Sequence, residues 1–216
     1  MTVIISNVQA SKLNQTYFIG DNDMDFCGSW ESNGKVFSIQ KDKNIYICSF
    51  PRKNIGIIFN NDLMVAEYDE TAQSAGIGVY SPIGDGSSLY ALWSSTGIRG
   101  QLGTGIALKC SESLGYDGEY KVQYFIGNRE GSSFLVRIKR KKDNIYKLAW
   151  LSDNKEVLHG IGFLIENSLA FAWGSLDCRF DFNRLYFNVD DETVRLKRQT
   201  VTWDSGKIST TIIREY

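Results

Sequence analysis

The only histidine of the chain, His159, is the first residue to consider for acid–base chemistry. A histidine acts as a general base when it lies beside a serine or cysteine that it can deprotonate. His159 stands next to Gly160-Ile161-Gly162 in an apolar stretch, and the sequence assigns it no nucleophile. We therefore interpret His159 as a structural or surface residue, and we predict a protein without catalytic residues.

Two groups of residues have the types that hold metal ions. The segment Asp21–Asp25 carries carboxylates at alternate positions, as the start of a calcium loop does, but Phe26 and Ser32 occupy the places of the required Gly and Glu. A structural zinc site needs four closely spaced Cys or His ligands. The four cysteines are scattered singly: Cys27, Cys48, Cys110 and Cys178. We predict no metal site, no cofactor and, since nothing implies an oxidising compartment, reduced thiols.

The glycine-rich segment 97–105 resembles a phosphate-binding loop only in composition. A phosphate cradle needs its glycines between a strand and the N-terminus of a helix. The residues that follow, Ile106-Ala107-Leu108-Lys109, form a short apolar stretch typical of a strand. The glycines are therefore interpreted as turn and strand residues.

Two basic runs, Arg137–Lys142 and Arg195–Arg198, raise the question of an anionic partner. The whole chain is balanced, with 24 basic and 25 acidic residues and a net charge of −1. Val136 and Ile138 alternate with Arg137 and Lys139, which predicts the outer face of a strand, where cationic side chains protect sheet edges from association. We predict no nucleic-acid partner.

The elements that must position these residues occur twice. Asn44-Ile45-Tyr46 returns 100 residues later as Asn144-Ile145-Tyr146, and Ile55-Gly56 returns 106 residues later as Ile161-Gly162. Such self-similarity defines the structural unit of a chain. We expect two repeats, 1–112 and 113–216, of which the first carries an insertion at residues 21–34.

Period-two alternation bounded by Gly, Asn, Asp or Ser predicts strands almost throughout, and no stretch has a helical stripe. Each repeat is expected to contain about eight strands, the first at Leu13–Gly20 and Gly118–Gly127. Evenly spaced strands with short turns favour an antiparallel up-and-down meander that closes into a barrel. The fold class predicted is all-β, with either two barrels or one closed sheet built from both repeats.

The alternation also predicts which side chains point inward. Tyr46, Cys48 and Phe50 share a face, as do Tyr146, Leu148 and Trp150 at the matching positions of the second repeat. Further along, Leu169, Phe171 and Trp173 share a face. Their counterparts are Leu63, Val65 and Glu67, so the third position is acidic in the first repeat.

Gly28-Ser29-Trp30 and Gly118-Glu119-Tyr120 resemble the Gly-x-Trp near the first strand of lipocalin and avidin-like barrels. The repeated pattern also resembles a group of uncharacterised bacterial proteins with lipocalin-like repeats. The second repeat fits better than the first, in which Gly-Ser-Trp falls within the expected insertion. In lipocalins a basic residue of the last strand packs across this Trp, a role that the resemblance implies for Arg214 and, in the first repeat, for Lys109.

The resemblance implies a non-catalytic binding protein that holds a small apolar or amphipathic ligand. Its expected site consists of inward aromatic residues and an arginine at the mouth: Tyr146, Trp150, Trp173, and Arg198 or Arg214. The alternative is a module with solidly packed barrels that binds a protein or a glycan. The sequence has neither a secretory signal nor an apolar run of the ~20 residues that a membrane helix needs, which predicts a cytoplasmic protein without a membrane span.

Overall fold

The computed structural model describes residues 26–98, 100–142, 144–190 and 193–215, all of which lie in strands, turns and loops. The expected strand Leu13–Gly20 and the acidic segment Asp21–Asp25 lie outside the described residues. The strands in chain order are β1 (Gly28–Ser32), β2 (Lys35–Asp42), β3 (Ile45–Cys48), β4 (Lys53–Phe59), β5 (Asp62–Tyr68), β6 (Ala75–Ile83), β7 (Ser88–Ser95), β8 (Gly103–Lys109), β9 (Gly118–Ile126), β10 (Arg129–Lys142), β11 (Ile145–Ser152), β12 (Lys155–Ile165), β13 (Ser168–Ser175), β14 (Phe180–Asp190), β15 (Thr193–Thr202) and β16 (Ile208–Glu215).

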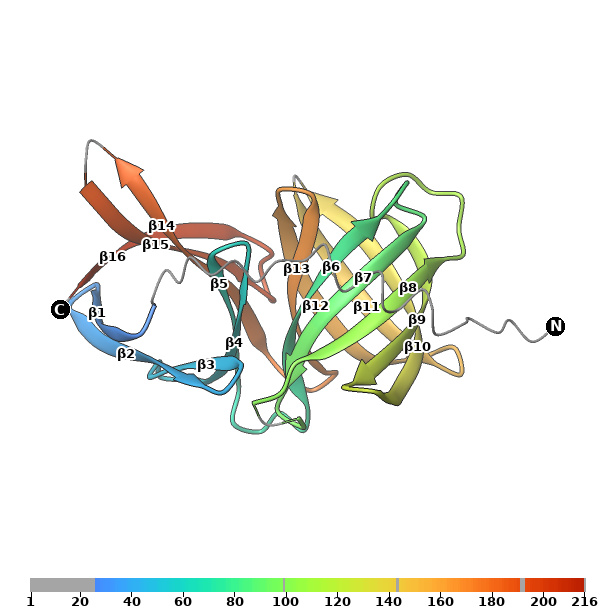
Figure 1. The fold of residues 1–216 in the computed structure, drawn as a ribbon, viewed down its shortest axis with the longest axis horizontal. Helices are drawn as coiled ribbons and strands as arrows, with labels where there is room; N and C mark the ends of the chain where they lie inside the picture. The colour runs from blue at the N-terminus through green and yellow to red at the C-terminus, as the bar shows by residue number, and fades with distance from the viewer. Residues whose placement is uncertain (1–25, 99, 143, 191–192, 216) are drawn as a thin grey trace.

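These strands form two closed antiparallel barrels that lie side by side (Figure 1). We call one the terminal barrel, with the order β1-β16-β15-β14-β5-β4-β3-β2. The other is the central barrel, with the order β10-β11-β12-β13-β6-β7-β8-β9. The all-β, antiparallel barrel architecture predicted from the sequence is confirmed.

The two repeats exchange their last three strands. Repeat one contributes β1–β5 to the terminal barrel and β6–β8 to the central barrel, and repeat two contributes β9–β13 to the central barrel and β14–β16 to the terminal one. Accordingly β5 pairs with β14, and β13 pairs with β6. The boundary expected between residues 112 and 113 therefore separates the repeats in sequence, but it does not separate the barrels in space.

The two connections that carry the chain between the barrels run beside each other. The segment after β5 bonds to the segment after β13 through Asp69 N–H, which donates to the carbonyl of Arg179 at 3.2 Å. Arg52, from the β3–β4 connection, joins both segments. Its guanidinium pairs with Asp69 at 3.2 Å and with Asp181 at 2.7 Å, and it donates to the Arg179 carbonyl at 2.7 Å.

Three apolar cores follow from the alternation of side chains along the strands. One fills the terminal barrel around Trp30, Tyr46 and Leu63, and another fills the central barrel around Tyr80 and Trp150. The third lies between the barrels, where the outer faces of their strands meet; it includes Ile57, Met64, Ile77, Ile161, Ala170, Ala172 and Phe182. The inward set Tyr146, Leu148 and Trp150 is as predicted.

The start of the first repeat differs from the expectation. Gly28-Ser29-Trp30 does not belong to an insertion; it forms β1, and Trp30 pairs with Phe37 of β2. Gly118-Glu119-Tyr120 begins β9 in the same way, with Tyr120 opposite Val136. Both first glycines have positive φ angles, 146° and 133°, a backbone conformation that favours glycine. The two motifs are therefore structural equivalents.

Candidate charged site at one end of the terminal barrel

Aromatic rings fill the central barrel because glycines on the neighbouring, hydrogen-bonded strands make room for them. Trp173 is registered opposite Gly76, and Phe171 opposite Gly78. A Cβ at Gly78 would lie 2.7 Å from the ring of Phe171, and one at Gly160 would lie 2.9 Å from the ring of Trp150. Pairing aromatic rings with glycines of neighbouring strands is a known means of closing curved sheets. The interior of this barrel is thus occupied by its own side chains.

The residues predicted to line a ligand cavity here belong to that packing. Tyr146 and Trp150 are buried, with 5% and 2% of their surfaces exposed, and Trp173 packs half-buried against the same core. The Trp150 indole donates to the hydroxyl of Tyr124 at 2.8 Å, and this hydroxyl also bonds to Tyr80. Burial raises the pKa of Tyr124 to about 12, so the hydroxyl pair stays protonated. These contacts explain the residues as core.

The equivalent end of the terminal barrel is charged. By strand register, Glu67 takes the place of Trp173, and Asp181 takes that of Gly76. Asn183 replaces Gly78 and Thr200 replaces Trp93 in the same comparison. The wall is also lower on one side, because β1 ends at Ser32, opposite the start of β2, whereas β9 continues to Ile126. The duplicated barrels have therefore diverged at this end.

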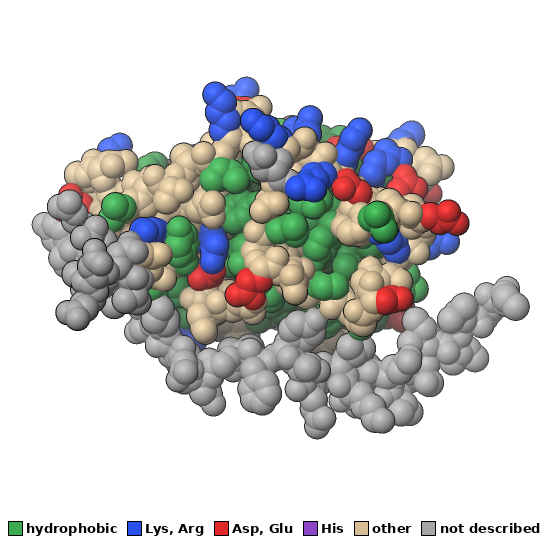
Figure 2. Space-filling view, turned by 90° about the horizontal axis from the view of Figure 1, so that it is seen from above, with side chains coloured by type: hydrophobic (Ala, Val, Ile, Leu, Met, Phe, Trp, Pro, Cys, Tyr) green, Lys and Arg blue, Asp and Glu red, His purple; other side chains and the backbone are tan. Residues whose placement is uncertain are grey.

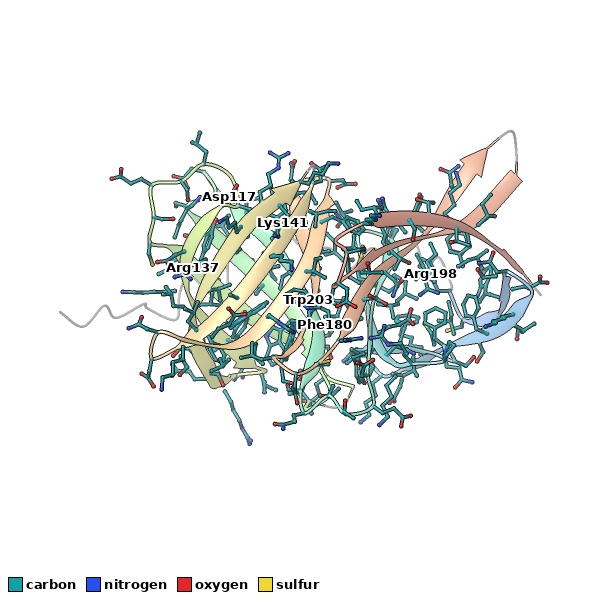
Figure 3. The ribbon with its side chains drawn as sticks, turned by 180° about the vertical axis from the view of Figure 1, so that it is seen from behind. Asp117, Arg137, Lys141, Phe180, Arg198 and Trp203 are labelled. Carbon is teal, nitrogen blue, oxygen red and sulfur yellow. The ribbon has the colours of Figure 1, made fainter. Side chains whose placement is uncertain are left out.

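Arg198 holds this polar group together from β15 (Figure 3). Its Nη2 donates to Oε1 of Glu67, and its Nε donates to Oδ1 of Asn183 at 2.9 Å. Asn183 in turn donates to Glu67 at 2.9 Å and accepts from the Thr200 hydroxyl at 2.7 Å. The guanidinium carbon of Arg198 lies 4.4 Å from the ring centroid of Phe50, a cation–π geometry. We call Glu67, Asn183, Arg198 and Thr200 the charged network.

Burial dominates the electrostatics of this network. Glu67 has 6% of its surface exposed and Asn183 has none. Desolvation raises the pKa of Glu67, against the opposing effect of Arg198. Desolvation likewise raises the pKa of Asp181, which Arg52 counteracts. Arg198 and the Asn183 amide donate hydrogen bonds to the Glu67 carboxylate, and Arg52 donates to the Asp181 carboxylate. Neither carboxylate is therefore placed as a general acid or base.

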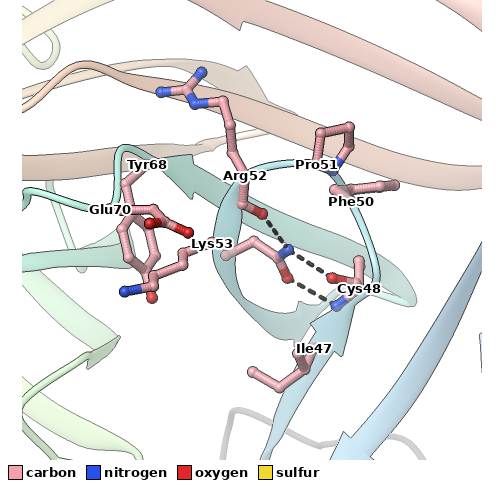
Figure 4. A pocket seen from close by; sticks show the side chains of 9 residues that line it. Ile47, Cys48, Phe50, Pro51, Arg52, Lys53, Tyr68 and Glu70 are labelled. Carbon is pink, nitrogen blue, oxygen red and sulfur yellow. Dashed lines mark hydrogen bonds between the residues drawn. The ribbon is translucent and has the colours of Figure 1, made fainter.

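A hollow of about 340 Å³ lies beside this end, at the β3–β4 connection (Figure 4). Its apolar lining is Ile47, Phe50, Pro51 and Tyr68, and its polar lining includes Arg52, Lys53, Asn54 and Glu70. The Asn54 side chain shapes the connection by accepting from the Cys48 amide at 2.7 Å and donating to the Cys48 carbonyl at 2.6 Å. Burial raises the pKa of the Cys48 thiol to about 12, so Cys48 is a structural residue here.

The structure separates the site residues predicted from the sequence. Tyr146, Trp150 and Trp173 lie in the central barrel, whereas Arg198 lies inside the terminal barrel, so they line no common cavity. The backbone of Arg214 pairs with Glu31 of β1, also in the terminal barrel. Lys109 does pack across an aromatic ring, with its Nζ 5.5 Å from the Tyr120 centroid. Because of the strand exchange, this lysine and this tyrosine come from different repeats.

His159 lies between the barrels, away from the charged network. It is buried, its ring centroid is 4.1 Å from that of Trp203, and Nε2 is 3.2 Å from the carbonyl oxygen of Cys178. Burial lowers its pKa. These contacts agree with the structural role predicted for it.

Sequence alternation identified Glu67 as an acidic residue at an inward position, but it could not identify the partners. Arg198 lies 131 residues away on a strand of the other repeat. Arg52 and Asn183 carry no sequence signal of their own.

Comparisons with protein-family models, with curated proteins and with solved structures found no match to this chain. Within the described residues no three Cys, His, Asp or Glu side chains are grouped so that they could hold a metal ion. The described part of the chain also contains no helix of the length and apolarity needed to cross a bilayer.

Proposed function

We propose that the protein is a non-catalytic binding protein with lipocalin-like barrels, and that its ligand is a small amphipathic anion held in the hollow beside the charged network. The observation that carries this proposal is the unequal divergence of the two barrels. The central barrel is packed with aromatic residues, whereas the equivalent end of the terminal barrel carries charges and borders a hollow.

The lining of the hollow suits such a ligand. A volume of about 340 Å³ lies at the lower end of the range for small-molecule sites, and both apolar and polar residues line this open hollow. Phe50, Pro51 and Tyr68 provide apolar surface, whereas the Arg52 guanidinium is already paired with Asp69 and Asp181. Lys53, whose side chain is exposed, supplies a cation for the anionic group of a ligand.

The test uses 8-anilinonaphthalene-1-sulfonate, an amphipathic anion that becomes fluorescent in apolar surroundings. We expect one saturable site per chain, with displacement by medium-chain fatty acids or aromatic carboxylates. Lys53→Glu should weaken binding about tenfold or more, as loss of a charge-assisted contact does. The control is Lys155→Glu at the exposed start of β12, which should leave binding unchanged. Absence of saturation, or equal binding by both variants, would refute the proposal.

The solid interior of the central barrel favours a second candidate, a module that binds a protein or glycan through its outer surface. On this alternative no small ligand saturates the hollow, and one partner is recovered repeatedly on immobilised protein. The two candidates are separated by whether Lys53→Glu changes the recovery of that partner, since a ligand in the hollow is not required for surface binding.

A further inference from the structure

The outer face of β9–β11 in the central barrel carries an array of lysines. Lys121, Lys139 and Lys141 are exposed, and Lys147 is half-buried. Lys139 and Lys147 stand directly opposite each other on paired antiparallel strands, an arrangement in which like charges repel. We call Lys121, Lys139, Lys141 and Lys147 the lysine face.

Protection of a sheet edge does not explain this face. The strand β10 is paired with β9 on one side and with β11 on the other, and β11 is also paired with β12. The central barrel is closed, so these strands have no free edge. The explanation suggested by the sequence alternation therefore lacks its structural basis here.

Internal ion pairs do not neutralise the lysine face either. Arg137, on the same strand face, is paired with Glu119 at 2.8 Å. Among the described residues Lys121, Lys139 and Lys141 take part in no ion pair. Lys147 rests 4.0 Å from the ring centroid of Trp203, with Glu156 and Asp204 in its surroundings. The face thus holds three lysines that take part in no ion pair among the described residues, one of which, Lys139, stands opposite Lys147.

We infer that the lysine face docks on an anionic lipid surface. Lys and Arg side chains gather along one long side of the molecule, with Asp and Glu side chains among them toward the central barrel (Figure 2), and Figure 3 shows Arg137 and Lys141 on β10. Lysines that project from the same side of the molecule can contact a flat anionic surface at the same time. Single-stranded nucleic acids are bound differently, by grooves with stacked aromatic rings. Here the face is the outer wall of a barrel, and Lys147 covers the ring of Trp203.

Each lysine near an anionic bilayer strengthens binding about fivefold, and added salt weakens it. The test is cosedimentation with phosphatidylcholine vesicles that contain or lack phosphatidylglycerol. We expect binding only to the anionic vesicles, with a loss on addition of salt. Lys139→Gln/Lys141→Gln should weaken this binding roughly 25-fold. The matched control, Lys35→Gln/Lys155→Gln, removes two exposed charges elsewhere and should bind within about twofold of the parent.

Equal loss in both double variants would show that only net charge matters and would overturn the inference. Absence of binding to the anionic vesicles would overturn it too, including a result in which the protein binds heparin or RNA through the same lysines. The inference does not depend on the proposed ligand site, since the Lys139→Gln/Lys141→Gln variant should still bind anilinonaphthalene sulfonate like the parent.

Discussion

Replacement of Arg198 by methionine tests the energetics of the charged network. Methionine keeps an apolar stem of similar length and removes the guanidinium that bonds Glu67 and Asn183. The Glu67 side chain, only 8% exposed, would keep the Asn183 amide as its remaining donor. Breaking a buried ion pair on one side typically costs 3–5 kcal/mol, because the other charge stays buried. We therefore expect Arg198→Met to lower the free energy of unfolding by about 3 kcal/mol.

The double variant Glu67→Gln/Arg198→Met removes both charges and keeps an acceptor for the Asn183 amide. Replacing both members of a buried pair is often neutral or stabilising, so we expect this variant to lie within about 1 kcal/mol of the parent. Urea denaturation followed by tryptophan fluorescence gives all the free energies of the cycle. The reasoning is refuted if Arg198→Met costs less than about 1 kcal/mol, or if the double variant is as unstable as the single one.

The deficit of Arg198→Met should also depend on pH. In the parent, burial already raises the pKa of Glu67 above its ordinary value of 4.5, and loss of Arg198 removes an opposing effect. A carboxyl with a raised folded-state pKa favours the folded state below its unfolded pKa, and this contribution is lost as pH rises through the folded value. The deficit should therefore shrink as pH falls from 7 towards 4.5. A deficit that is constant over this range would contradict the buried-charge explanation.

Three further changes test separate parts of the structure. Arg52→Ala removes the contacts that join the two crossing connections, and we expect a loss of about 1–3 kcal/mol in a single cooperative urea transition, since both barrels contain strands of both repeats. Two resolved transitions would contradict this. Gly78→Ala places a Cβ 2.7 Å from the Phe171 ring, so calorimetry should show a destabilisation of about 1–3 kcal/mol; an unchanged Tm would contradict the glycine–aromatic packing. Cys27 and Cys110 are exposed and should react rapidly with a disulfide reagent at pH 8, whereas the buried Cys48 should react only after denaturation; fast reaction of Cys48 would refute its burial.

The sequence predicts the strands and the inward aromatic residues because alternation is a local property. The partner of each strand is not local. β5 and β13 have matching patterns of side chains. Pairing of β5 with β6 of its own repeat would therefore satisfy the same alternation as its pairing with β14, so the alternation does not predict the exchange of strands between the repeats. In the structure, short connections after β5 and β13 carry the chain from one barrel to the other, and Arg52 bonds to both connections.

The charged network illustrates the same limit at the level of a site. The alternation places Glu67 inward, and a buried carboxylate is unfavourable unless another group pairs with it. The partner, Arg198, appears in the sequence within a basic run that reads as a surface feature. Only the pairing of β5 with β14, and of β14 with β15, brings Glu67, Asn183 and Arg198 to one end of a barrel.

The most direct test of the account is to ask which barrel responds to an amphipathic anion. Titration of isotope-labelled protein with anilinonaphthalene sulfonate, followed by amide and indole NMR signals, reports on both barrels at once. We predict saturable shifts for amides around Lys53 and Tyr68, with the indole signals of Trp150 and Trp173 unchanged. Shifts of those two indoles with no change near Lys53 would place the ligand in the central barrel and contradict the account.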